Sequence, residues 1–285
     1  DKPRGAVAAG AAPRFFNYLL SDETEVLMAI VVDQVTKRFI ARGQEVHALQ
    51  PTSMTINDGE FVAFVGPSGC GKSTLLNMIA GIFQPTTGTI THDDRVITSV
   101  NRAVGYMTQM DSLLPWRTVE QNVRLPLQIQ GLGRGEIEDR LDKMLSMVNL
   151  SKFRNHFPKE LSGGMRKRAA LAQLLIYEPG TILMDEPFGA LDAQLKLVMQ
   201  AELLKIWADT GKTIVFVTHD LAEAISLAQR VIVFTGQPGT IKHISEIDLG
   251  PQRDVFKDRF EKKFQDYYEV LWAELAPEIH KGGDL

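Results

Sequence analysis

The sequence predicts an α/β protein in which buried strands of a parallel sheet alternate with amphipathic helices. Short, unbroken apolar runs rich in β-branched residues are typical of strands that are covered on both faces. Such runs occupy residues 26–32, 61–65, 181–184, 213–217 and 230–234. Between them apolar residues recur at helical spacing, most clearly from Ile137 to Val148, where they form one stripe of a helix.

Composition and charge exclude several classes of protein. Of the 285 residues, 44% are hydrophobic, which is enough for a packed core. The net charge of −4 gives no reason to expect binding to nucleic acid or to acidic lipid. The one cysteine cannot form an internal disulfide, which favours a reducing compartment. The apolar runs fall far short of the roughly 20 residues of a membrane-spanning helix, so we expect none.

We expect three parts along the chain. Residues 1–24 contain a run rich in Ala, Gly and Pro and are predicted to be a tail, residues 25–250 an α/β domain, and residues 251–285 a helical tail. Residues 112–177 lack a convincing buried strand, which predicts a helical insertion within the domain. The C-terminal part has large apolar residues at helical spacing, which predicts a packing surface. They are Phe256, Phe260, Phe264, Tyr267, Tyr268, Leu271, Trp272 and Leu275.

A phosphate-binding loop is predicted between the strand at 61–65 and a helix at 75–80. Residues 66–73 fit the pattern G-x-x-x-x-G-K-S/T. Its glycines allow backbone N–H groups to turn toward phosphates, Lys72 can reach the β- and γ-phosphates, and the Ser73 hydroxyl can bind Mg²⁺. Cys70 is interpreted as a small filler of the loop. The predicted nucleotide-binding residues here are Gly66, Pro67, Ser68, Gly69, Cys70, Gly71, Lys72, Ser73 and Thr74.

Acidic and basic side chains follow two other predicted strands. Asp185 and Glu186 come directly after the strand at 181–184, and His219 follows the strand at 213–217. Ligands bind at the carboxyl ends of strands in open α/β sheets. Asp185 is therefore a candidate Mg²⁺ ligand, and Glu186 is a candidate for polarising an attacking water. Taken alone, an Asp-Glu pair or a single histidine at a strand end is also common as a purely structural feature.

A second anion site is predicted where residues 161–165 precede a basic amphipathic helix. Ser162 followed by Gly163 and Gly164 leaves open N–H groups at a helix N-terminus. An ordinary glycine-rich helix cap is the alternative. A chain that binds one nucleotide does not need two phosphate-binding sites, unless the second site binds a nucleotide held by another copy.

These motifs, in this order, resemble the ATP-binding subunits of ABC transporters over about residues 25–248. The resemblance rests on the phosphate loop, on Gln109 after a strand, on the signature at 161–165, on residues 181–186, on the loop at 190–192 and on His219. It implies a P-loop NTPase core with an N-terminal β subdomain and an inserted helical subdomain. It also implies two copies arranged head to tail, with each ATP held between the phosphate loop of one and the signature of the other.

The resemblance assigns a role to each matching residue. Glu186, His219 and Lys72 would be catalytic, and Ser73, Gln109 and Asp185 would serve Mg²⁺. Phe39, in a place where the family usually has tyrosine, would stack on adenine, and Val46 would add an apolar contact. Asp192 would couple the two ATP sites. The signature residues acting on the ATP of the other copy would be Leu161, Ser162, Gly163, Gly164 and Met165.

The residues in and around two of these motifs resemble a subgroup of importers. Residues 109–123 and 161–168, with Met165 where glutamine is commoner, resemble importers of nitrate, sulfonates, taurine, bicarbonate and similar solutes. Such importers use two membrane permease subunits and an external solute-binding protein, with the ATPase peripheral at the cytoplasmic face of the inner membrane. Leu113, Leu114 and Trp116 lie where the family docks the permease, although a loop this apolar can instead close the protein's own core.

Other functions remain as alternatives. A soluble, non-transport ABC ATPase would usually carry a second cassette, a coiled-coil insertion or basic patches, and the sequence has none of these. A P-loop kinase would not need the signature or His219. An exporter is disfavoured by the separate single cassette. The transported solute is not encoded in this chain, because the permease and the binding protein contact it.

Overall fold

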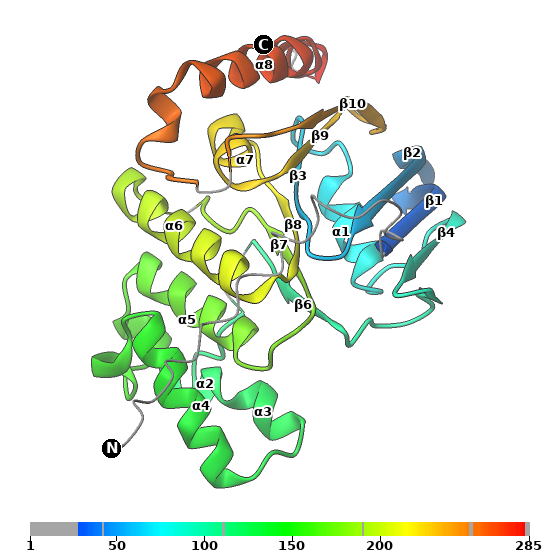
Figure 1. Ribbon diagram of the computed structural model, residues 1–285. Coiled ribbons are helices and arrows are strands. Elements are labelled where there is room, and N and C mark those ends of the chain that lie inside the picture. Colours follow the sequence, from blue (N-terminus) through cyan, green and yellow to red (C-terminus); the bar gives the residue numbers. More distant parts are fainter. Residues whose placement is uncertain (1–27, 42, 110–111, 190, 251–252, 283–285) are drawn as a thin grey trace, which may run out of the picture.

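The computed structural model describes residues 28–41, 43–109, 112–189, 191–250 and 253–282, and the predicted tail at 1–24 lies outside them. Two sheets lie side by side with helix α1 (Lys72–Ile79) between them, and a group of helices extends to one side of the larger sheet (Figure 1). Among the described helices, none combines the length and apolar character that crossing a membrane requires.

The smaller sheet is antiparallel and comes from the N-terminal part. It contains β1 (Met28–Ala41), β2 (Gln44–Asn57), β4 (Thr87–His92) and β5 (Arg95–Val96), in the order β2-β1-β4-β5. The run at 26–32 was predicted to lie in a parallel sheet and to be covered on both faces, and its described part corrects this. Ile30 and Val32 are buried while Val31 is half-buried, because alternate residues of β1 face opposite sides of the strand.

The larger sheet carries the predicted buried strands. It contains β3 (Phe61–Val65), β6 (Val104–Met107), β7 (Thr181–Asp185), β8 (Thr213–Val217), β9 (Arg230–Phe234) and β10 (Ile241–Glu246). Their order is β10-β9-β3-β8-β7-β6, and all neighbours are parallel except β10 and β9. Every residue of β3, β7 and β8 is buried. Complete burial explains why these strands appear in the sequence as unbroken apolar runs.

Helices cover both faces of the larger sheet. On one face, Leu75, Leu76 and Ile79 of α1 share a core with Val62 and Phe64 of β3 and with residues of the smaller sheet. On the other face the alternate residues of β3 pack with α5 (Gly163–Leu175), α6 (Ala193–Thr210) and α7 (Leu221–Leu227). The strand ends are thus held between two apolar layers.

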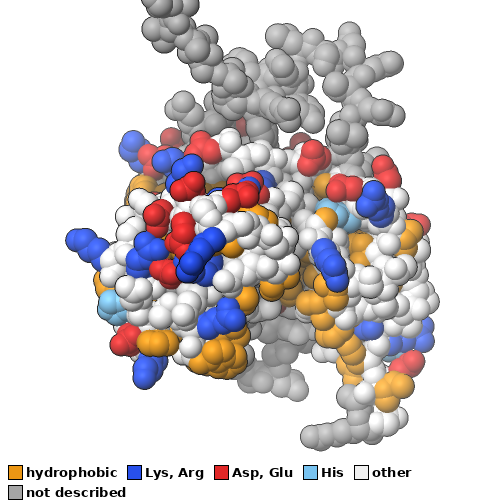
Figure 2. Space-filling view, turned by 90° about the horizontal axis from the view of Figure 1, so that it is seen from below, with side chains coloured by type: hydrophobic (Ala, Val, Ile, Leu, Met, Phe, Trp, Pro, Cys, Tyr) orange, Lys and Arg blue, Asp and Glu red, His pale blue; other side chains and the backbone are white. Residues whose placement is uncertain are grey.

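The segment between β6 and β7 consists, in its described residues, of helices and turns. It contains α2 (Val119–Val123), α3 (Leu125–Ile129), α4 (Arg134–Met147), two 3₁₀ turns (Ser151–Phe153 and Pro158–Glu160) and α5. Ile137, Leu141 and Leu145 form the buried stripe of α4 that the sequence predicts. Ion pairs tie its surface together: Arg124 and Arg154 both reach Glu120, at 2.6 and 2.7 Å. Acidic and basic side chains intermingle on this side of the molecule (Figure 2).

The C-terminal part forms a 3₁₀ turn (Asp258–Phe260) and a long helix, α8 (Lys262–Gly282), which packs on α7, β9 and β10 at the top of Figure 1. The predicted packing stripe divides into two groups. Phe264, Leu271 and Leu275 are buried against the core, whereas Phe260 and Trp272 remain exposed. The contact is also polar, because Gly236 N donates to the buried Glu278 carboxylate at 3.1 Å.

Candidate nucleotide site

The phosphate loop connects the buried end of β3 to α1. Gly71, the N-cap of α1, has a left-handed backbone (φ 97°), and a Cβ there would lie 2.5 Å from the Ala48 carbonyl oxygen. Only glycine fits this position, because a side chain would both strain the backbone and collide with β2. A glycine N-cap supplies no side-chain acceptor, so the first N–H groups of α1 are left for an anion.

Lys72 is held inside this loop. Its ammonium donates to the carbonyl oxygens of Gly66 and Pro67, both at 2.8 Å, and the residue is buried. Burying an ammonium group without partners would be costly, so these two carbonyls stabilise it. Cys70 is also fully buried, with its Sγ 3.4 Å from the Lys72 Nζ, as expected of a filler residue. A phosphate entering the loop would compete with the two carbonyls for the same ammonium.

Ser73 and Asp185 meet across the gap between α1 and β7. The Ser73 hydroxyl donates to Asp185 Oδ1 at 2.9 Å. Burial raises the pKa of Asp185, and the hydrogen bond from Ser73 opposes this effect. Hydroxyl and carboxylate oxygens are ligands that Mg²⁺ prefers, usually together with substrate phosphates. Among the described residues, no group of three His, Cys, Asp or Glu side chains could hold a metal ion. A Mg²⁺ ion at this pair would therefore draw further ligands from phosphate and water.

Glu186, which follows β7, is contacted by one residue that follows β6 and one that follows β8. Its Oε2 accepts from the Gln109 amide at 2.9 Å, and its Oε1 lies 3.5 Å from His219 Nδ1. The Glu186 backbone is left-handed (φ 47°) and its N–H donates to the Val217 carbonyl at 2.9 Å. A positive φ outside glycine costs about 1–2 kcal/mol, and such strain is frequent at functional sites. Two residues that the sequence singled out, Gln109 and His219, thus converge on the carboxylate of a third, Glu186.

The loop that carries His219 is supported by a buried polar network. The Thr218 hydroxyl donates to Glu223, whose other carboxylate oxygen is 2.7 Å from Lys196 Nζ on α6. Asp220 caps α7 by accepting from the N–H groups of Ala222 and Glu223. Sequence analysis did not identify this network, because its members are far apart in sequence and each is of an ordinary polar type.

The signature residues begin α5. The Ser162 hydroxyl caps the helix by accepting from Met165 N at 3.3 Å. Gly164 is buried against α6: a Cβ there would lie 1.8 Å from Leu195 Cδ2. Asp192 caps α6 by accepting from Leu195 N at 3.0 Å. The structure therefore joins the start of the signature helix to the helix that Asp192 begins.

Phe39 and Val46 are brought together on the smaller sheet. They are paired across β1 and β2, so their side chains share one face, and both are half-buried. The Phe39 ring packs edge to face on Phe83 with 5.8 Å between centroids, and Lys37 Nζ lies 5.1 Å from the Phe39 centroid. This gives an apolar surface next to a cation on the smaller sheet, whereas Glu186 follows a strand of the larger one.

The three residues predicted to contact a permease differ in how deeply they are buried. Leu113 is buried in the core, as the alternative interpretation of this loop predicts, and Leu114 is half-buried. Fully buried Asn122 on α2 holds the loop, accepting from Leu114 N at 2.7 Å and donating to the Leu114 and Arg117 carbonyls. Trp116 alone of the predicted trio is well exposed, at 70%.

Comparison with known proteins identifies the family. The ABC transporter family model matches residues 49–189. The nitrate import ATP-binding protein NrtD of Synechocystis is 43% identical over 249 residues, covering 86% of this chain and 94% of that protein. The taurine import ATP-binding protein TauB of Yersinia pestis is 43% identical over 203 residues, covering 71% and 80%. The chain belongs to the ABC transporter ATP-binding proteins.

A solved structure supports the same assignment for the fold of this ABC ATPase. The ATP-binding cassette MJ0796, a dimer in a post-hydrolysis state bound to ADP and Pi, matches with a TM-score of 0.70 and 32% identity. The match covers 76% of this chain and 98% of that one. The protein is therefore an ATP-binding ATPase with the ABC cassette fold, as the sequence predicts.

Proposed function

We propose that this ABC ATPase is the ATP-hydrolysing subunit of an importer for a small solute of the nitrate, sulfonate, taurine or bicarbonate kind. The observation that carries the enzymatic part is the convergence of Gln109 and His219 on Glu186, beside the Ser73–Asp185 pair. Support for the importer part comes from two relatives, named as nitrate and taurine import proteins, that are 43% identical over most of this chain.

Different residues would bind the phosphates, the adenine, the Mg²⁺ ion and the attacking water at the ATP site. Lys72 and the backbone N–H groups of residue 66 and residues 68–74 would hold the phosphates, and Phe39 with Val46 would receive the adenine. Ser73, Asp185 and Gln109 would hold Mg²⁺, which neutralises the charge that develops on the phosphates. Glu186 would accept a proton from the attacking water, while Gln109 and His219 keep its carboxylate in place.

We propose that the ATP site is completed by a second subunit, in a homodimer or a pseudo-dimer. Ser162, Gly163 and Gly164 would present their N–H groups to the nucleotide of the partner, flanked by Leu161 and Met165, which pack inward. Asp192 would link the two sites, because it begins the helix against which Gly164 packs. The dimeric state of MJ0796 supports this arrangement.

The proposed complex places the ATPase at the cytoplasmic face of the inner membrane, on two permease subunits that receive solute from an external binding protein. The exposed Trp116 and the half-buried Leu114 would contact the permease, with Leu113 supporting them from the core. We propose no role with nucleic acid. The proposed division of the chain is a tail at 1–24, an ABC domain at 25–250 with its helical subdomain at about 112–177, and a helical tail at 251–285.

The experiment that tests the enzymatic proposal is Glu186→Gln, with Glu178→Gln as its matched control. Both glutamates have a positive φ, but the Glu178 side chain is 68% exposed and forms an ion pair with Arg140 at 3.8 Å. Glu186→Gln should bind ATP, accumulate as an ATP-bound dimer in size-exclusion chromatography, and lose about 100-fold or more in turnover, as removal of a general base does. Glu178→Gln should behave as the native chain. Substantial turnover by Glu186→Gln would refute the role of Glu186.

The transport proposal is tested by purifying the tagged chain from detergent-solubilised membranes of its native cell and identifying by mass spectrometry what accompanies it. A polytopic permease with a solute-binding protein is the expected result, and their identity would indicate the solute. Recovery only from the soluble fraction with ribosomes or DNA would favour a non-transport ABC ATPase, without affecting the assignments at the ATP site.

A further inference from the structure

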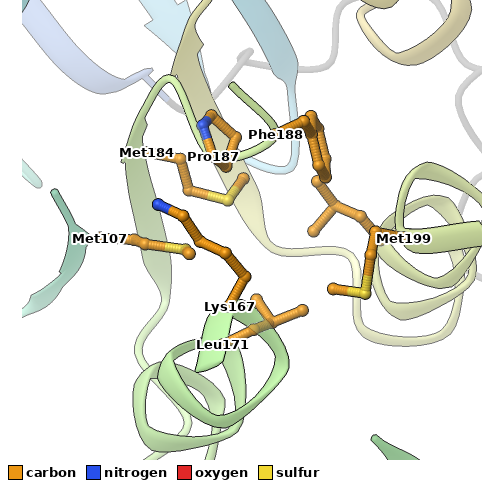
Figure 3. Close-up of a pocket in the computed structure, with 8 residues that line it drawn as sticks. Met107, Lys167, Leu171, Met184, Pro187, Phe188 and Met199 are labelled. Carbon is orange, nitrogen blue, oxygen red and sulfur yellow. The ribbon is translucent and has the colours of Figure 1, made fainter. Parts of the chain in front are cut away.

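A second buried lysine lies outside the phosphate loop. Lys167 is on α5, two residues after the signature, and is only 4% exposed. Its side chain runs through a small apolar cavity between α5, α6 and the ends of β6 and β7 (Figure 3). The aliphatic part of the side chain suits these surroundings. The cavity is lined by Met107, Leu171, Met184, Pro187, Phe188 and Met199.

The ammonium group of Lys167 reaches the backbone next to the catalytic cluster. Its Nζ donates to the Gln109 carbonyl oxygen at 2.6 Å, a short, charge-assisted hydrogen bond. The positive charge of Lys167 also lowers the pKa of Asp185, although burial raises that pKa more strongly. A lysine is costly to bury in an apolar cavity, so a hydrophobic residue would fill this position at lower cost unless the ammonium has a task.

The hydrogen bond gives α5 a direct connection to Glu186. The Gln109 main chain is held by Lys167, and the Gln109 amide, on the same residue, donates to Glu186 Oε2 at 2.9 Å. Gln109 is exposed and lies beyond the end of β6, so the β ladder does not fix it. Ser162, at the start of the same helix, is the residue that would face the partner's nucleotide.

We propose that Lys167 is a positioning residue that fixes Gln109, and through it Glu186, according to the position of the signature helix. This inference rests on the proposed roles of Gln109 and Glu186. A subunit whose signature is engaged by a partner would thereby have its own Glu186 aligned. The connection runs inside one chain, from the signature that serves one ATP to the carboxylate that serves the other.

The test is a double-mutant cycle in the whole chain, measured as steady-state ATP hydrolysis. Lys167→Met removes the donor, and methionine suits a cavity that already contains Met107, Met184 and Met199. We expect kcat to fall about tenfold with KM for ATP unchanged, which is what losing one charge-assisted hydrogen bond in the transition state would do. In a Gln109→Ala background the same substitution should change kcat by less than about twofold, because the route through Gln109 is already gone.

A second variant separates the hydrogen bond from the charge. Lys167→Gln keeps an N–H donor but is neutral, and it should recover most of the rate that Lys167→Met loses. If Lys167 acted through its charge on Asp185, Lys167→Gln would be as slow as Lys167→Met, and both would need more Mg²⁺. That result, or an equal loss with and without the Gln109 side chain, would overturn the proposal.

The failure of this inference and that of the proposed function are distinguishable in the same assay. If Glu186→Gln retained turnover, the roles of Glu186 and Gln109 would be wrong whatever Lys167 does. If Glu186→Gln is inactive while Lys167→Met and Gln109→Ala have additive effects, only the inference about Lys167 fails. A lowered melting temperature with unchanged kcat would identify Lys167 as a structural residue and would equally overturn the proposal.

Discussion

The ends of the parallel strands and the start of the signature helix present their functional groups in different ways. Asp185 is the last residue of β7, a strand that is wholly buried, paired on both sides and covered by helices, and Glu186 follows it directly. Ser162 and Gly164 start a helix of the insertion, which meets the core through side-chain contacts such as Gly164 against Leu195 and Lys167 to Gln109. The first group is fixed by backbone hydrogen bonds, the second by packing.

The difference follows from what each region is proposed to do. A carboxylate that binds Mg²⁺ or orients water must stay in place within a fraction of an ångström, which a buried sheet provides. A signature that closes on the ATP of a partner has to be carried by a unit whose attachment can adjust, and side-chain contacts allow this more readily than a β ladder. Substitutions in the two regions should therefore have different effects on ATP hydrolysis and on stability.

The largest effect is expected in the sheet region, from Asp185→Asn. The substitution keeps an acceptor for Ser73 but removes the charge, so ATP hydrolysis should fall on the order of 100-fold because the proposed Mg²⁺ ligand is lost. Stability should change in the opposite direction. Burial raises the pKa of Asp185, so the folded state holds the proton more tightly, and the native chain loses stability as the pH rises through that raised pKa.

Asp185→Asn should therefore melt at a higher temperature than the native chain at neutral pH, and the difference should shrink in acid, where Asp185 is itself protonated. Thermal melts across this pH range, with hydrolysis measured in parallel, provide the check. A variant that is both inactive and less stable at neutral pH would contradict the role of burial at this position.

An intermediate effect is expected in the signature region, from Gly164→Ala. The added Cβ would lie 1.8 Å from Leu195 Cδ2, the end of a half-buried side chain, so Leu195 must turn away, and the free energy of unfolding should fall by about 1 kcal/mol. Gly135→Ala is the matched control, since this glycine of α4 has no atom near its Cβ position and should gain about 0.5 kcal/mol. Urea unfolding of both variants measures the difference, and equal stabilities would show that α5 does not pack tightly on α6.

The smallest effect on the isolated chain is expected from Trp116→Ala. A side chain that is 70% exposed should change the free energy of unfolding by no more than about 0.5 kcal/mol and leave ATP binding unaltered. Association with the permease should nevertheless weaken in co-purification, whereas Trp272→Ala, at another exposed tryptophan, on α8, should leave it unchanged. Undiminished association and transport with Trp116→Ala would contradict the assigned contact.

Several structural features were predicted from short patterns. The buried strands β3, β7, β8 and β9 were recognisable because a strand covered on both faces must be apolar at every position. The strands β2, β4 and β10 did not appear among these runs, since they have at least one solvated face and a mixed sequence. The run that starts β1 was assigned to the wrong sheet, because an apolar run does not reveal whether its partners are parallel or antiparallel.

Lys167 illustrates a weak signal that sequence analysis could have used. It falls three residues after Gly164 and four before Leu171, on the buried face of α5, where an apolar residue is expected. A charged residue at such a position indicates a buried partner, but neither composition nor spacing names it. Leu113 gives no such signal, because an apolar residue is expected both in a core and at an interface, so its sequence position does not distinguish the two.

The sequence by itself determined the ABC family, the ATPase activity and the positions of the motifs, because each motif is a local pattern whose chemistry depends on residues close together in the chain. Only the tertiary structure decided which groups meet: Gln109 and His219 at Glu186, Lys196 at Glu223, and Lys167 at the Gln109 carbonyl. These contacts join segments separated by many residues, and they form only when parallel strands align their carboxyl ends and the insertion packs against them.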